Sequence, residues 1–210
     1  MKKRIFASLL LLLNTILWAT YYAVAKEALH RIDPIIFSFL ELSSIAPIAL
    51  CLLLITRKQL TKDLWLRGSK LGVWLWLTVF TSIIALKYTS ATNTAFFPSL
   101  NGFLAALIAW GVLRQSIAKG TWLAGAISVG GALFMIFDGS GGGTGGIGDG
   151  VAFLSAIFYT CYVFQVDHET GSGDVSRLPL FAIELLIMAV LASIAAFVLG
   201  DWHTFHPVLP

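Results

Sequence analysis

Two glutamates stand alone inside long apolar stretches of the 210-residue chain. Glu41 follows the residues FSFL, and Glu184 follows LFAI. Placing an aspartate, lysine or arginine at the centre of a membrane helix costs about 2.5–3.5 kcal/mol, so an ionisable side chain there usually faces a cavity or a partner. A carboxylate in that position can contact a substrate amine or couple transport to protons. The alternative is a structural ion pair with Lys26 or Lys87.

Aromatic rings with polar tips recur on one face of two predicted helices. In the first helix, the positions i, i+4, i+7 and i+8 hold Asn14, Trp18, Tyr21 and Tyr22. The corresponding face later in the chain carries Ser155, Tyr159 and Tyr162. Such rings can line a cavity for a zwitterion or a flat organic molecule. The alternative is an aromatic belt at the membrane surface, which suits Tyr21 and Tyr22 near the end of their helix.

Asn93 is the last candidate residue. Its side-chain amide can form a hydrogen bond with a substrate or with a neighbouring helix. The candidate substrate-binding residues are Asn14, Trp18, Tyr22, Glu41, Asn93, Tyr159, Tyr162 and Glu184. No enzyme is expected, because the four histidines fall in loops or the carboxy-terminal tail and no serine sits in a nucleophile elbow. Cys51 and Cys161 have no metal-ligand spacing, so we expect no metal site and no cofactor.

Seven apolar stretches must position these side chains. Hydrophobic residues make up 58% of the chain and charged residues only 12%, whereas a soluble domain has about 25% charged residues. A membrane helix needs about 20 apolar residues. The candidate spans are Ile5–Ala25, Pro34–Thr56, Leu71–Leu86, Ala91–Leu113, Thr121–Phe137, Gly150–Val166 and Leu178–Gly200. The sequence therefore predicts an all-α membrane protein embedded in a lipid bilayer.

The distribution of basic residues predicts the orientation of these spans. With the amino terminus in the cytoplasm, 11 of the 14 lysines and arginines lie inside, and only Lys26, Arg31 and Lys87 lie outside. Cytoplasmic loops of membrane proteins carry such an excess. We therefore expect a multi-pass protein of the bacterial inner membrane with a cytoplasmic amino terminus. The basic excess then reports topology and indicates no nucleic-acid partner.

The chain contains two similar segments of opposite predicted orientation. LWATYYAVAKE, from Leu17, matches IFYTCYVFQVDHE, from Ile157, at an offset of 140, and the two solitary glutamates match at an offset of 143. Five predicted helices precede the second copy, and an odd number inverts it relative to the first. Inverted repeats are the plan of many secondary transporters, whose substrate sites lie near the midplane.

A glycine-rich tract, DGSGGGTGGIGDG, joins the two copies at Asp138–Gly150. It lacks the Gly-Lys-Ser/Thr ending of a phosphate-binding loop, and no strand precedes it. Uncharged glycine-rich sequence behaves as a flexible linker. We therefore predict a first repeat of five helices at 1–137, a linker at 138–149, and a partial second repeat of two helices at 150–210.

The stretch ALKYTSATNTAFFPSLNGFLAALIAW, from Ala85, followed by WLAGA from Trp122, resembles the drug/metabolite transporter superfamily and, within it, the EamA-like permeases. The resemblance implies ten helices in two inverted five-helix repeats around a central cavity, of which this chain would hold seven. It also implies export of amino acids or other small metabolites by alternating access. The family often has an arginine in the second helix where this chain has Glu41.

The resulting hypothesis is a membrane exporter of a small-molecule substrate. One alternative is a non-transporting membrane subunit, and another is an inactive fragment of a permease. Since three helices of the implied plan are missing, we also consider a homo-oligomer or pairing with another half-transporter chain.

Overall fold

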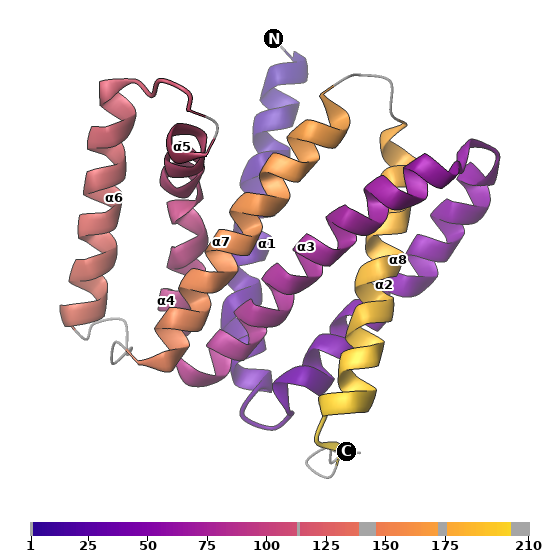
Figure 1. Ribbon diagram of the computed structural model, residues 1–210. Helices are drawn as coiled ribbons and strands as arrows, with labels where there is room; N and C mark the ends of the chain where they lie inside the picture. Colours follow the sequence, from indigo (N-terminus) through magenta and orange to yellow (C-terminus); the bar gives the residue numbers. More distant parts are fainter. Residues whose placement is uncertain (1, 113, 139–145, 172–175, 203–210) are drawn as a thin grey trace.

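The computed structural model describes residues 2–112, 114–138, 146–171 and 176–202. These residues form helices joined by short turns, with no strand in the described ranges. The α-helices are α1 (Lys2–Ala28), α2 (Pro34–Thr56), α3 (Lys62–Tyr88), α4 (Ala91–Phe96), α5 (Asn101–Gly111), α6 (Lys119–Asp138), α7 (Ile147–Thr170) and α8 (Arg177–Leu199), as Figure 1 shows. Two 3₁₀ turns, η1 (Arg57–Gln59) and η2 (Phe97–Leu100), follow α2 and α4.

Among the described residues, five helical segments are long and apolar enough to cross a membrane. They are Ser8–Ala28, Pro34–Gln59, Lys62–Tyr88, Ile147–Thr170 and Arg177–Leu199. The chain is therefore an all-α membrane protein, as the sequence predicts. The third predicted span, Leu71–Leu86, is the middle of a longer helix. Its polar first turns are stabilised by the Thr61 side chain, which accepts a hydrogen bond from the Leu64 amide at 3.1 Å.

The fourth predicted span, Ala91–Leu113, is interrupted. It begins as α4, tightens into η2 around Pro98, and continues as α5. A proline lacks a backbone N–H and its ring crowds the preceding turn, so it interrupts an α-helix. The break leaves α5 with 11 residues. The fifth predicted span corresponds to α6, which has 20 residues.

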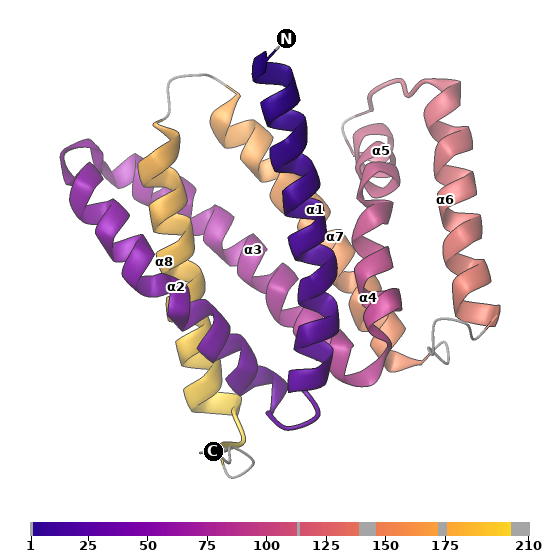
Figure 2. The same ribbon diagram turned by 180° about the vertical axis from the view of Figure 1, so that it is seen from behind.

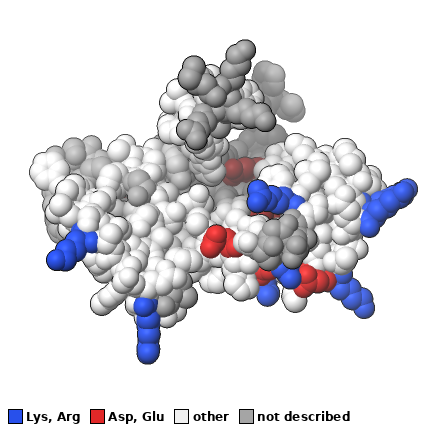
Figure 3. Space-filling model, turned by 90° about the horizontal axis from the view of Figure 1, so that it is seen from above, with Lys and Arg blue, Asp and Glu red and all other residues white. Residues whose placement is uncertain are grey.

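The helices alternate in direction along the chain, so that α1 and α7 run in opposite directions, as do α2 and α8 (Figure 1). We term the end that holds the amino terminus the inner end, in keeping with the predicted orientation. Residues 139–145 of the glycine-rich tract lie outside the described ranges, and the residues on either side of them are at the outer end. Seen from the inner end, lysines and arginines project from the periphery of a mostly uncharged surface (Figure 3).

Helix α3 crosses the molecule diagonally between α7 and α8, and α8 also packs against α2 (Figures 1 and 2). Small residues allow these close crossings. A Cβ atom added at Gly68 would lie 2.7 Å from Ile183, and one at Gly72 would lie 2.9 Å from the Glu184 carbonyl oxygen. Membrane helices associate through such small residues, here spaced as GxxxG.

Candidate functional site

The first predicted glutamate is held by a tyrosine of the preceding helix. Asp33 caps α2 by accepting hydrogen bonds from the first amides of that helix, which lets the chain reverse tightly after α1. The reversal places Tyr21 beside Glu41. The Tyr21 hydroxyl donates a hydrogen bond to Glu41 Oε2 at 3.0 Å. Both side chains are partly buried.

The second glutamate is held in the same way. The Tyr162 hydroxyl in α7 donates to Glu184 Oε1 in α8 at 2.7 Å. Glu184 is only 3% exposed. In each half of the chain, therefore, a tyrosine of one helix orients a carboxylate of the next helix. Neither carboxylate forms an ion pair with a basic side chain among the described residues.

The two pairs lie at mirrored depths. Glu41 stands seven residues after Pro34, the first residue of α2, and Glu184 stands seven residues after Arg177, the first residue of α8. At 1.5 Å per residue, each is about 10 Å along its helix. Because α2 and α8 run in opposite directions, Glu41 is nearer the outer end and Glu184 nearer the inner end.

One further tyrosine packs beside the tyrosine of each pair. The Tyr21 ring contacts the Tyr22 ring edge to face, with centroids 5.5 Å apart. On α7, Tyr159 stacks on Tyr162 at 6.1 Å.

The predicted residues fall into three groups. One group lies in the two tyrosine–glutamate pairs and the rings beside them, together termed the tyrosine–glutamate cluster, and comprises Tyr22, Glu41, Tyr159, Tyr162 and Glu184. Trp18 borders the cluster, with its ring 5.6 Å from that of Tyr21, but it is 50% exposed. Asn14 is exposed one turn further toward the inner end of α1, and Asn93 lies in a separate buried cluster at the outer end.

That outer cluster surrounds the buried carboxylate of Asp149 in the first turn of α7. Its Oδ1 accepts a hydrogen bond from the Thr89 hydroxyl and another, at 3.0 Å, from the Asn93 amide. Lys26 joins α1 to the same place by donating to the carbonyl oxygens of Thr89 and Leu86. The cluster therefore fastens the start of α7 to the ends of α1 and α3.

A second buried carboxylate fastens the other end of α7. Glu169 is 3% exposed and lies 3.5 Å from Arg67 and 3.9 Å from Lys70, both on α3. Gln165, one turn earlier in α7, donates to it as well. Helices α3 and α7 are thus joined by polar contacts at both ends.

Sequence reasoning did not select Tyr21, Asp149 or Glu169 as site residues. Tyr21 was on the aromatic face, but the repeat alignment pairs Tyr22 with Tyr162. Asp149 was assigned to the linker, although an acid in the first turn of a helix is a recognisable signal. No group of three or more His, Cys, Asp or Glu side chains suited to a metal ion occurs in the part of the chain that the structure describes.

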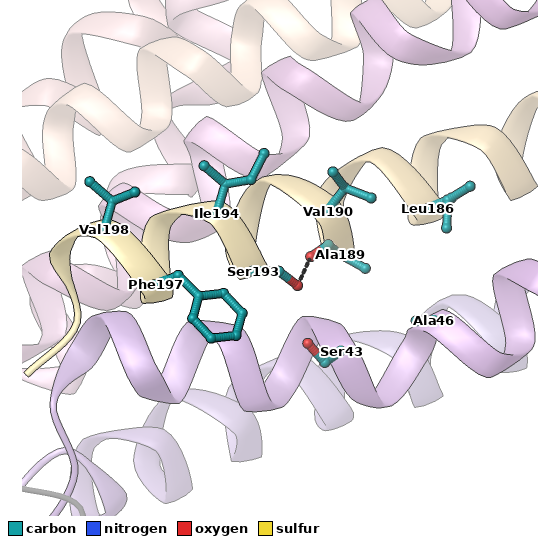
Figure 4. A pocket seen from close by; sticks show the side chains of 9 residues that line it. All are labelled: Ser43, Ala46, Leu186, Ala189, Val190, Ser193, Ile194, Phe197 and Val198. Carbon is teal, nitrogen blue, oxygen red and sulfur yellow. Dashed lines mark hydrogen bonds between the residues drawn. The ribbon is translucent and has the colours of Figure 1, made fainter. Parts of the chain in front are cut away.

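An apolar groove of about 460 Å³ lies between α2 and α8. Side chains of α8 such as Val190 and Ile194 line one side and Ser43 and Ala46 of α2 line the other (Figure 4). None of the sequence-predicted site residues lines this groove, so it does not serve as their binding cavity.

The EamA-like transporter family matches residues 5–137 of the chain. The chain belongs to this family. An uncharacterized transporter from Archaeoglobus fulgidus is 27% identical over 189 residues, which cover 88% of the chain and 57% of the relative. The chain therefore spans just over half the length of that relative. No solved structure matches the chain described here. Family membership and the apolar helices together make this chain a multi-pass membrane protein of the EamA-like transporter family.

Proposed function

We propose that this EamA-like protein exports a small metabolite, such as an amino acid or a related amine-bearing compound, across the bacterial inner membrane. The single observation that carries the proposal is the pair of tyrosine-held carboxylates at mirrored depths. Each lies in an apolar environment, and each occupies the same place in its half of the chain. A substrate site shared by two inverted halves has this form.

The chemistry of the two carboxylates favours a substrate amine as their partner. Lys26 directs its ammonium group to backbone carbonyl oxygens at the end of α3 instead of to either glutamate. The structural ion pair considered above therefore has no support from Lys26. Charge-assisted hydrogen bonds are about twice as strong as neutral ones, so an ammonium group that reaches Glu41 or Glu184 would gain a strong contact.

The proposed cycle is alternating access with a cytoplasmic amino terminus. In this cycle, Glu41 would face the outer side and Glu184 the cytoplasm. A substrate would leave one carboxylate and bind the other when the protein changes state. The neighbouring rings of Trp18, Tyr22 and Tyr159 would contact the apolar part of the substrate.

The test is efflux of radiolabelled amino acids from proteoliposomes containing the chain, screened one at a time. Glu41→Gln and Glu184→Gln should each lower the rate for a transported amino acid by about tenfold or more, because a neutral amide loses the charge-assisted contact. Glu27→Gln is the matched control, since Glu27 is an exposed glutamate near the end of α1. Equal efflux from all three variants and the parent would leave the glutamates with a structural role only.

The exposure of α1 favours one further element of the proposal, which is pairing with additional helices. Large side chains around its inner half are all at least half exposed, from Leu9 through Leu17. They include Leu9, Leu10, Leu11, Leu12, Leu13, Ile16 and Leu17. We propose that another half-transporter chain or a second copy covers part of this surface, and crosslinking from a cysteine at Leu13 tests it.

A further inference from the structure

We propose that the outer cluster around Asp149 binds a sodium ion. Its side-chain oxygens come from Thr89 at the end of α3, Asn93 in α4 and Asp149 in the first turn of α7. A bound ion therefore joins α7 to the helices that precede the glycine-rich tract. The site goes beyond the proposed export and does not depend on it, because the export rests on Glu41 and Glu184.

Two side-chain oxygens of this cluster are buried and unpaired. Asp149 Oδ2 and Asn93 Oδ1 each lack a hydrogen-bond partner in the part of the chain that the structure describes. Asp149 is 5% exposed and Asn93 is 1% exposed. The two side chains are in direct contact, since Asn93 Nδ2 donates to Asp149 Oδ1 at 3.0 Å. Both unpaired atoms are acceptors, so the partner that satisfies them is a hydrogen-bond donor or a cation.

The charge of Asp149 favours a cation over a water molecule. A buried water would satisfy hydrogen bonds but would leave the carboxylate charge uncompensated. Buried charges in proteins are paired or coordinate metal ions. Asp149 forms no ion pair with any basic side chain among the described residues. The amino-terminal end of α7 supplies only about half an elementary positive charge. A bound cation offsets the remainder.

The nearby lysine is engaged elsewhere. Lys26 Nζ donates to the carbonyl oxygens of Leu86 and Thr89, the latter at 2.8 Å. The carboxyl end of a helix carries about half an elementary negative charge, and these carbonyl groups lie at the end of α3. The ammonium group of Lys26 therefore offsets the charge at the end of α3 and leaves Asp149 without an ion-pair partner.

The kinds of oxygen in the cluster indicate which cation it takes. Carboxylate, amide and hydroxyl oxygens suit hard cations, whereas transition metals prefer imidazole or thiolate ligands. A single carboxylate balances one positive charge, which favours a monovalent ion over calcium with its 6–8 oxygen ligands. Transporters coordinate sodium at the carboxyl ends of helices and at interrupted helices. Here α3 ends at the cluster, and Asn93 lies in the short helix before the break at Pro98.

The sequence-based expectation of no metal site rested on the cysteines and histidines, which an all-oxygen site does not use. The signal in the sequence is weak, because Asn93 and Asp149 are 56 residues apart. Only the packing of α7 against α3 and α4 brings their oxygens together.

Sodium itself is the probe in the test. Binding of radioactive sodium to the full chain in detergent is measured with choline chloride keeping the ionic strength constant. The proposal expects saturable binding that approaches one ion per chain. Asp149→Asn should lower the affinity about tenfold or more, because the site loses its only carboxylate. Asn93→Leu removes the amide oxygen at similar side-chain size and should also weaken binding.

Three variants serve as controls for these changes. Asp167→Asn removes an exposed carboxylate from the same helix, α7, and should leave sodium binding unchanged. Glu41→Gln and Glu184→Gln should leave it unchanged as well, because neither side chain belongs to the outer cluster. Helical circular dichroism shows which variants fold.

Thermal unfolding provides a second readout. Sodium at 100 times its dissociation constant should raise the melting temperature of the parent by about 5–11 °C relative to choline, and should not raise that of Asp149→Asn. No saturable sodium binding by the folded parent would show that water alone fills the cluster and would overturn the proposal. Equal affinity in the parent and in folded Asn93→Leu and Asp149→Asn would place the ion elsewhere and also overturn it. The proposed export fails separately, by unchanged amino-acid efflux in the Glu41 and Glu184 variants.

Discussion

Replacing Gly148 by alanine tests the contact between the start of α7 and the end of α3. A Cβ atom at Gly148 would lie 2.6 Å from the Tyr88 carbonyl carbon, 2.8 Å from the Thr89 nitrogen and 2.8 Å from the Tyr88 oxygen. All three are backbone atoms, so no side-chain rotation can relieve the overlap. The two helix ends must move apart instead.

The structure sets the size of the effect. Restoring an ordinary contact of about 3.4 Å requires a displacement of about 0.8 Å in a region packed as densely as an organic crystal. Overpacking costs about 1–3 kcal/mol. The same movement strains the hydrogen bonds from Thr89 and Asn93 to Asp149, each worth about 0.6–2 kcal/mol between membrane helices. Because the two bonds are strained and not broken, we count about half of their combined value, and the free energy of unfolding should fall by about 2–5 kcal/mol in total.

The measurement is thermal unfolding in detergent, followed by helical circular dichroism. A loss of 2–5 kcal/mol in a chain of this size lowers the melting temperature by about 4–20 °C. Gly150→Ala is the matched control. It lies two residues further along α7 with nothing within 4 Å of its added Cβ, so it should be neutral or gain up to about 1 kcal/mol from helix propensity. Equal melting temperatures for the two variants would refute the close approach.

Two other predictions test topology and the inner end of α7. Thr144→Cys, in a background where Cys51 and Cys161 are alanine, should react with an impermeant thiol reagent in whole cells. Labelling only after membrane disruption would reverse the orientation drawn from the basic residues. Glu169→Gln should lower the free energy of unfolding by about 1–3 kcal/mol, because Arg67 and Lys70 lose the negative charge of their buried partner. Asp63→Asn is its exposed control and should change unfolding little.

Hydropathy predicted where the spans lie better than where the helices end. Apolar length indicates burial in lipid, but a helix continues into polar sequence when local contacts support it. Helix α3 begins nine residues before the predicted Leu71, where Thr61 caps it and Asp63 pairs with Arg67. Pro98 lies at the break between α4 and α5, whereas Pro47 lies inside the continuous helix α2. A proline in the sequence therefore does not by itself predict a break. Only packing distinguishes the two prolines.

The candidate site could be predicted in part, because the sequence gives both the side-chain type of each residue and its position along a predicted helix. A solitary glutamate in an apolar run and a tyrosine at helical spacing identify the components. The pairing of Tyr21 rather than Tyr22 with Glu41 depends on the rotation of α1 against α2, which no spacing within one helix determines. Asn93 shows the same limit, since its partner Asp149 lies 56 residues away across a glycine-rich tract.

The two buried carboxylates of α7 also constrain any motion between the proposed halves. Separating α7 from α3 would expose or unpair Asp149 at one end and Glu169 at the other, and leaving a buried polar group unpaired costs about 1–3 kcal/mol. A transport cycle that separated α7 from α3 would have to break the contacts at both ends of α7.

Helix α1 is attached differently. Its contacts are concentrated near its outer end, at Tyr21, Tyr22 and Lys26, while its inner half is exposed. A movement of α1 about that outer attachment would leave both ends of α7 intact. It would alter the position of Tyr21, whose hydroxyl holds Glu41 of α2. The geometry therefore favours α1, rather than the whole first half, as the element that moves against α3 and α7.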